Sequence, residues 1–194
     1  AHADTLAKVA QSGQITMAYR ESSVPFSYLD KGKPVGMAVD ISNAVVEAVK
    51  KATGKSDLKV NWQAVTSQNR IPLLMNGTVD LECGSTTNNT TRAKDVDFAI
   101  NHFYTGTRLL VKKSAGIKDY ADLKGKTVAV TAGTTNLQVL RHILQEDYRL
   151  LFAKEGMRAL EMAERERPDH VHLVLLPRGR NPGGVAEADR KSVV

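Results

Sequence analysis

The chain has 194 residues, of which 42% are hydrophobic and 25% charged, and its 27 Lys and Arg against 21 Asp and Glu give a formal net charge of +6. These proportions exclude collagen-like, low-complexity and wholly disordered proteins. No apolar run approaches the roughly 20 residues that span a bilayer. The single cysteine, Cys83, excludes an internal disulfide and a zinc site built from several cysteines.

The predicted elements alternate between strands and helices from the N-terminus onward. Apolar residues at every second position indicate strands, and apolar residues three or four positions apart indicate helices. We expect strands at 14–19, 58–65, 79–83, 107–112 and 126–131, and helical segments at 37–52, 69–75, 119–123 and 136–145. This alternation predicts an α/β fold with a largely parallel sheet.

The composition changes near residue 149. Before that point there are 13 Lys and 5 Arg, whereas the last 46 residues hold 2 Lys and 7 Arg. We expect a helix over 150–167, a strand over 171–176 and a loose tail over 177–194, because that tail is rich in Arg, Pro and Gly and lacks an apolar period.

The positive charge is spread along the chain and interleaved with acidic residues. No basic stripe with stacking aromatic residues is present, and only 5% of the residues are aromatic. A groove for nucleic acid requires both features. We therefore expect no nucleic-acid partner.

Three predicted strand ends place small hydroxyl residues beside an arginine, at 20–23, 66–70 and 84–92. In an open α/β sheet, the loops at the carboxyl ends of the strands converge on one crevice. The guanidinium group offers a fork of donors that matches a carboxylate, and hydroxyl groups add further donors. The pattern predicts a site for a small ligand with two negative groups, although any one of these arginines, taken alone, is more often a surface residue.

Five runs of the sequence carry a resemblance to a known family. They are YRESSVPFSY from residue 19, TSQNRIPLL from 66, NGTVDLECGSTTNN from 76, TGTRLLVKK from 105 and DLKGKTVAVTAGTT from 122. Together they resemble the glutamate/aspartate-binding proteins of bacterial ABC importers, over residues 6–142. The resemblance implies a type II periplasmic binding protein fold, with two lobes that each hold a central, mostly parallel sheet flanked by helices. We expect the first lobe at 1–104, part of the second at 105–176 and a loose tail at 177–194.

The resemblance also implies which residues bind the ligand. Arg20, Ser67 and Arg70 would reach the side-chain carboxylate; Ser85, Thr87 and Arg92 would hold the amino-acid backbone; and Thr135 would contribute from the second lobe. No catalytic residue, metal or cofactor is expected. The implied function is capture of L-glutamate or L-aspartate in the periplasm, after removal of a signal peptide, for an ABC permease in the inner membrane. The alternatives are a dehydratase-type enzyme on the same fold, which the low aromatic content disfavours, and a shortened remnant or sensor with weak binding.

The motif match ends near His142. In the family, a later histidine contacts the ligand and an aspartate pairs with its α-ammonium group, and we find no convincing counterpart of that aspartate here. We interpret the change in composition as a shifted reading frame or a fusion that leaves a shortened, incomplete first lobe. An apolar face and sheet edge exposed in this way would favour self-association.

Overall fold

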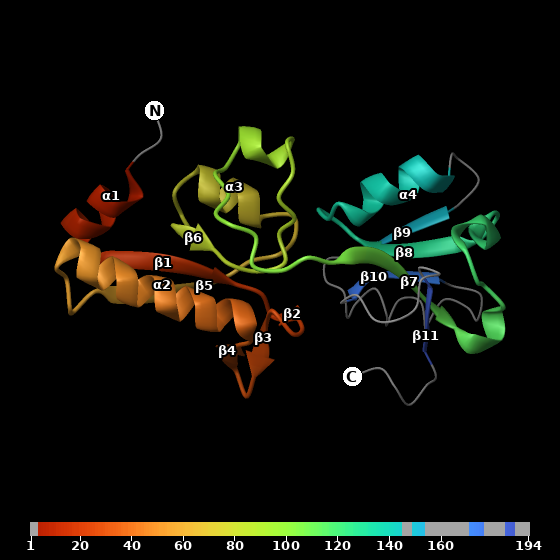
Figure 1. The fold of residues 1–194 in the computed structure, drawn as a ribbon, viewed down its shortest axis with the longest axis horizontal. Helices are drawn as coiled ribbons and strands as arrows, with labels where there is room; N and C mark the ends of the chain where they lie inside the picture. Colours follow the sequence, from red (N-terminus) through yellow and green to blue (C-terminus); the bar gives the residue numbers. More distant parts are fainter. Residues whose placement is uncertain (1–3, 145–148, 154–170, 177–184, 189–194) are drawn as a thin grey trace. The chain divides into compact units, whose positions relative to one another are not determined.

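The computed structural model describes residues 4–144, 149–153, 171–176 and 185–188 (Figure 1). The chain divides into two units, Ala1–Phe98 and Ala99–Val194. Within the described residues, no helix has the length and apolar character needed to cross a bilayer. The lobe boundaries expected from the sequence, at 104 and 176, stay a prediction.

A parallel three-stranded sheet forms the centre of the first unit. Its middle strand is β1 (Gln14–Tyr19), with β5 (Lys59–Ala64) on one side and the short β6 (Leu81–Glu82) on the other. Tyr19 pairs with Ala64, and Ala18 with Glu82. The three strands therefore end at the same edge of the sheet.

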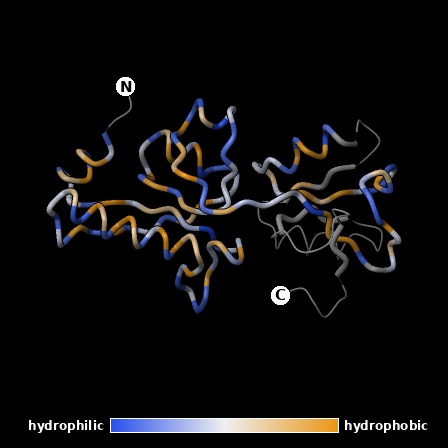
Figure 2. The backbone as a smooth tube through the Cα atoms, in the orientation of Figure 1, coloured by the Kyte–Doolittle hydropathy of each residue, from blue (hydrophilic) through white to orange (hydrophobic). Residues whose placement is uncertain are grey.

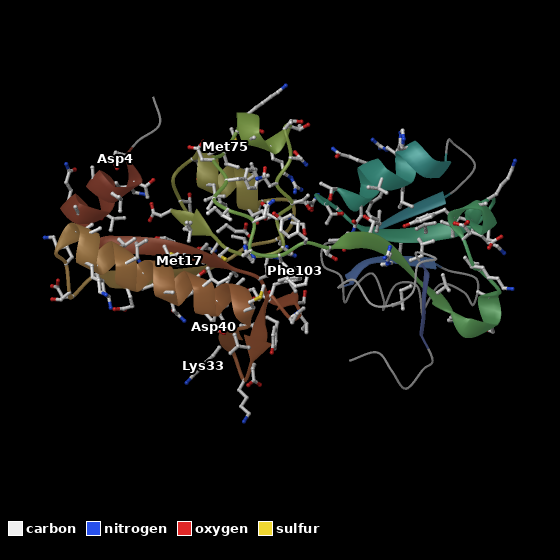
Figure 3. The ribbon with its side chains drawn as sticks, viewed as in Figure 1. Asp4, Met17, Lys33, Asp40, Met75 and Phe103 are labelled. Carbon is white, nitrogen blue, oxygen red and sulfur yellow. The ribbon has the colours of Figure 1, made fainter. Side chains whose placement is uncertain are left out.

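Helices cover both faces of this sheet. On one face, Ile15 and Met17 of β1 pack with Val9 of α1 (Thr5–Ser12) and Val46 of α2 (Met37–Thr53) (Figure 3). On the other face, Ala18 lies in a cluster with residues that include Leu73 of α3 (Arg70–Met75). Successive residues of a strand point to opposite faces, so β1 contributes side chains to both halves of the core.

The sequence of α2 explains its length and its orientation. Ala38, Val39, Ser42 and Val46 are buried at helical spacing, and Figure 2 shows polar and apolar positions alternating along the helix. Gly54 ends the helix in the left-handed conformation (φ 68°), where its N–H donates to the carbonyl of Lys50.

A small antiparallel sheet lies between β1 and α2 in the sequence. It consists of β2 (Ser22–Ser23), β3 (Ser27–Asp30) and β4 (Lys33–Val35). The turn between β3 and β4 places Lys31 and Gly32 at positive φ, which is the geometry of a two-residue hairpin. The sequence analysis expected only a polar turn at 20–23.

The second unit contains a five-stranded mixed sheet in the order β11-β7-β10-β8-β9. The strands are β7 (Gly106–Lys112), β8 (Thr127–Thr131), β9 (Arg149–Ala153), β10 (Val171–Leu176) and β11 (Val185–Ala188). Only the β7 and β10 pair is antiparallel. Leu109, Val111, Val128 and Val130 of this sheet pack with Leu140 of α4 (Asn136–Leu144) and with Leu123 of the short helix η3 (Tyr120–Leu123). The predicted α/β class with mostly parallel sheets is confirmed.

Two expectations for the C-terminal part are wrong. The helix expected over 150–167 begins instead as β9, which pairs residue by residue with β8 from Thr127↔Arg149 to Thr131↔Ala153. The tail expected to be loose contains β11, which pairs in parallel with β7. Pairing with distant strands overrides the local preferences of these segments. The remainder of both expected segments lies outside the described residues. Between them, the strand predicted at 171–176 is confirmed as β10.

Asp80 ties α1 to the sheet. Its Oδ1 accepts a hydrogen bond from Nζ of Lys8 at 2.7 Å, its Oδ2 accepts one from the N–H of Thr16 at 2.8 Å, and its side chain is only 5% exposed. We expect Asp80→Ala to lower the free energy of unfolding by about 2–3 kcal/mol, because the part-buried N–H of Thr16 loses its acceptor and the Lys8 ammonium group, which also donates to the carbonyl of Gly77, loses its charged partner. Urea unfolding measures this change.

Lys8→Met is the matched control for Asp80→Ala. The Lys8 side chain is 45% exposed, so its ion pair should contribute less than about 1 kcal/mol. Equal losses of stability in the two variants would contradict a structural role for the bond from Thr16 to Asp80.

Candidate functional site

The three turns that carry the arginines leave the same edge of the first unit's sheet. Arg20 follows β1 directly, residues 66–70 follow β5, and residues 83–92 follow β6. Because β1 is registered in parallel with both neighbours, these turns start beside one another. The sheet therefore brings cationic and hydroxyl side chains from distant parts of the sequence to one edge.

Arg20 is fixed by the small antiparallel sheet. Its N–H donates to Oγ of Ser27 at 2.8 Å, and the same hydroxyl donates to the carbonyl of Arg20 at 3.2 Å. Arg20 is 4% exposed and Ser27 is fully buried. The backbone of Arg20 is thus clamped on both sides, which limits the positions available to its guanidinium group.

Ser67 lies in a turn just before α3, and Arg70 is the first residue of that helix. The N–H of Thr66 donates to Oδ1 of Asn69 at 2.7 Å, and the N–H of Asn69 donates to Oγ1 of Thr66 at 3.2 Å. Reciprocal bonds of this kind are typical of Asx and ST turns. Both Ser67 and Arg70 are buried, at 6% and 3% exposed.

The loop after β6 supplies further hydroxyl groups and Arg92. The Ser23 hydroxyl of β2 donates to Oγ of Ser85 at 3.1 Å, which links this loop to the turn that follows Arg20. Nη1 of Arg92 donates to the carbonyl of Thr87 at 3.0 Å. Arg92 is only partly buried, and burial lowers the pKa of its guanidinium group while the charge of Glu82 opposes that change.

Sequence reasoning missed Glu82, the last residue of β6, and Gly84 in the loop that follows. The Thr86 hydroxyl donates to Oε2 of Glu82 at 2.6 Å, so an acid lies among the cationic groups. A Cβ added to Gly84 would collide with Oε1 of Glu82. The signal in the sequence was an acidic residue at the end of a predicted strand, whereas the expected site consisted only of cationic and hydroxyl groups.

Cys83 is an unreactive thiol in this environment. Burial first and the charge of Glu82 second raise its pKa to about 11, against a smaller lowering by a hydrogen bond with Ser42. The thiol is therefore protonated at neutral pH, whereas nucleophilic cysteines are thiolates.

Thr135 belongs to the second unit. It precedes α4, and its carbonyl accepts the N–H of Val139 at 3.1 Å. The turn before it is closed by the Thr134 hydroxyl, which donates to the carbonyl of Thr131 at 2.8 Å. Its part in ligand binding stays a prediction.

The chemistry of the first unit's site is that of an anion receptor. Its groups are guanidinium donors, hydroxyl donors and the carboxylate of Glu82, which lie at or after the ends of the three parallel strands. In the described ranges, no cluster of three His, Cys, Asp or Glu residues could hold a metal ion. Charge-assisted hydrogen bonds to carboxylates are the interactions that these donors make best.

Residues 15–182 match the family model described as bacterial extracellular solute-binding proteins, family 3. The L-glutamate/L-aspartate-binding protein of Pseudomonas aeruginosa is 56% identical over 139 residues, which cover 71% of this chain and 46% of that protein. The glutamate/aspartate import solute-binding protein of Salmonella typhimurium is 55% identical over 157 residues, covering 80% of this chain and 50% of that protein. The Escherichia coli protein of the same name is 45% identical over 204 residues, covering 93% of this chain and 68% of that protein. The chain thus spans about half the length of the first two relatives.

Solved structures share the fold. An ancestral amino-acid-binding protein described as a precursor of cyclohexadienyl dehydratase superposes with a TM-score of 0.77 at 26% identity, covering 89% of this chain and 74% of that chain. An ancestral arginine-binding protein bound to arginine gives a TM-score of 0.73 at 26% identity, covering 84% and 70%. The family model extends past His142, where the motifs recognised in the sequence end.

Proposed function

Because the chain belongs to family 3 of the bacterial extracellular solute-binding proteins, we propose that it captures L-glutamate or L-aspartate in the periplasm and delivers it to an ABC permease in the inner membrane. The observation that carries this proposal is the burial of Arg20 and Arg70 at the sheet edge that also bears the hydroxyl-rich loop. The names of the relatives support the choice of an acidic amino acid. Capture of this kind involves no bond making, so the proposal is a binding protein and not an enzyme.

The proposed contacts divide the ligand into two ends. Arg20, Ser67 and Arg70 bind the side-chain carboxylate, and Ser85, Thr87 and Arg92 bind the amino-acid backbone. Thr135 is the proposed contribution of the second unit. Self-association is not part of this proposal and stays an expectation from the sequence.

The expected affinity follows from the number of charged contacts. A hydrogen bond to a charged group is worth about 1.5–3 kcal/mol. Three or four such bonds, less the cost of immobilising the ligand, give roughly −8 kcal/mol, which corresponds to micromolar binding.

Calorimetry on the full chain tests the proposal with L-glutamate, L-aspartate, L-glutamine and prephenate. We expect micromolar or tighter binding of at least one acidic amino acid and at least about tenfold weaker binding of L-glutamine, because its amide cannot form the charged contacts with Arg20 and Arg70. Equal affinity for L-glutamine and L-glutamate would contradict the assigned site. Turnover of prephenate would support the dehydratase alternative, and binding of none of the four would support the remnant.

A further inference from the structure

The carboxylate of Glu82 lies at the start of the loop that is proposed to bind the ligand, yet the proposed contacts do not use it. Glu82 is the last residue of β6 and is partly buried. Its Oε2 accepts the hydrogen bond from Thr86 at 2.6 Å. Its Oε1 is buried and accepts no hydrogen bond from the residues that the structure describes.

Two of the site's arginines lie near this carboxylate. A Cβ built on Gly84 would contact both Oε1 of Glu82 and, at 3.9 Å, Cγ of Arg20. The Glu82 carboxylate and the aliphatic part of the Arg20 side chain therefore both lie next to Gly84. On the other side, the charge of Glu82 acts on the guanidinium group of Arg92 and raises its pKa against the effect of burial.

The burial of Oε1 indicates how Glu82 can act. Protein atoms cover this oxygen, so a ligand does not touch it in this conformation. A charge at this position still acts through space, because electrostatic interactions are strong where water is excluded. Glu82 therefore influences the ligand through its charge and through its hold on Thr86.

The charge of Glu82 affects different anions differently. It repels a ligand carboxylate, which opposes the arginines, and it attracts an ammonium group. An acidic amino acid carries an ammonium group beside its carboxylates, so the two effects partly cancel. A plain dicarboxylate of the same length experiences only the repulsion. A charge of this kind gives specificity by disfavouring the wrong ligand.

We propose that Glu82 is a specificity-determining residue, which makes the site favour an acidic amino acid over a dicarboxylate that lacks the ammonium group. The inference rests on the proposed function of the same loops. Beyond that function, it predicts that the site discriminates against one class of ligand, the dicarboxylates without an amino group. Glutarate, which is L-glutamate without its amino group, represents this class.

The test compares L-glutamate with glutarate in calorimetry on the full chain and on Glu82→Gln. The amide of glutamine keeps an oxygen for the Thr86 hydroxyl but removes the charge. We expect the ratio of the glutarate Kd to the L-glutamate Kd to fall at least about tenfold in Glu82→Gln, mainly because glutarate binds more tightly.

Thr86→Val is the matched control, because it removes the hydrogen bond and leaves the charge in place. It should weaken both ligands by similar factors and change the ratio by less than about threefold. If Glu82→Gln does not unfold cooperatively, Glu82→Met removes the same charge without burying an amide, and the ratio is judged in the same way.

The outcomes separate this inference from the proposed function. A ratio that stays the same in the neutral variants, in a chain that binds L-glutamate, overturns the role of Glu82 and leaves the proposed function standing. A fall in the ratio as large in Thr86→Val as in Glu82→Gln assigns the effect to loop geometry and also overturns it. A chain that binds neither ligand overturns both.

Discussion

Replacing Arg70 with alanine is expected to weaken L-glutamate binding by about 100- to 1,000-fold in calorimetry. Arg70 is 3% exposed and follows a turn closed by two reciprocal hydrogen bonds, so its side chain is packed within the protein and its backbone starts from an ordered turn. Two charge-assisted hydrogen bonds to one carboxylate are worth about 3–6 kcal/mol, and the expected loss takes the lower part of that range, since each 1.4 kcal/mol is a factor of about ten in Kd. Donors that are already ordered in the free protein lose little of this binding free energy to the entropy cost of fixing a side chain.

Two variants control for the loss of Arg70. Arg70→Lys keeps the charge but not the fork of donors, and it should recover only part of the affinity. Lys94→Ala removes an exposed cation from the same unit and should leave Kd within about twofold. Wild-type affinity in Arg70→Ala, or equal losses in Arg70→Ala and Lys94→Ala, would show that Arg70 does not contact the ligand.

Gly36→Ala is expected to cost about 3 kcal/mol or more of stability, which corresponds to a fall in Tm of about 6–12 °C. Gly36 precedes α2 at φ 117°, and a Cβ there would lie 2.6 Å from the carbonyl oxygen of Phe26 and 2.8 Å from that of Pro25. Those carbonyl oxygens accept the N–H groups of Ala38, at 2.8 Å, and Met37, at 3.2 Å. A methyl group therefore pushes the start of α2 away from the acceptors that hold it. Thermal unfolding followed by circular dichroism measures the change.

Gly54→Ala is the control for the collision at Gly36. Gly54 also has a positive φ, of 68°, but a Cβ there would meet no atom within 4 Å. This substitution should cost only the conformational penalty of about 1–2 kcal/mol. Equal losses at the two glycines would show that the close approach to Phe26 does not matter for stability.

Local signals account for the elements that the sequence predicted well. The apolar spacing of α2 and the glycine that ends it lie within one segment of the chain, so both can be predicted from the local sequence. The buried run of β8 is equally local. In contrast, β9 is a strand because Arg149–Ala153 pairs with Thr127–Thr131. Such pairing depends on the fold and not on local preference, which is why a helix was expected there.

The site shows the same division between local and non-local information. The turns of Arg20, Arg70 and Arg92 could be placed on one sheet edge because parallel strands end together. The clamp on Arg20 could not be predicted, because Ser27 reaches it through a hairpin that the sequence analysis missed. The role of Thr135 stays a prediction, because it depends on the second unit.

A crystal structure of the full chain with L-glutamate tests the central claim most directly. We expect guanidinium nitrogens of Arg20, Arg70 and Arg92 within about 3 Å of the two ligand carboxylates, with the Arg20 and Arg70 groups on the side-chain end. L-glutamate held at any other place, or its carboxylates bound by residues other than Thr135 and those of the three turns, would contradict the account.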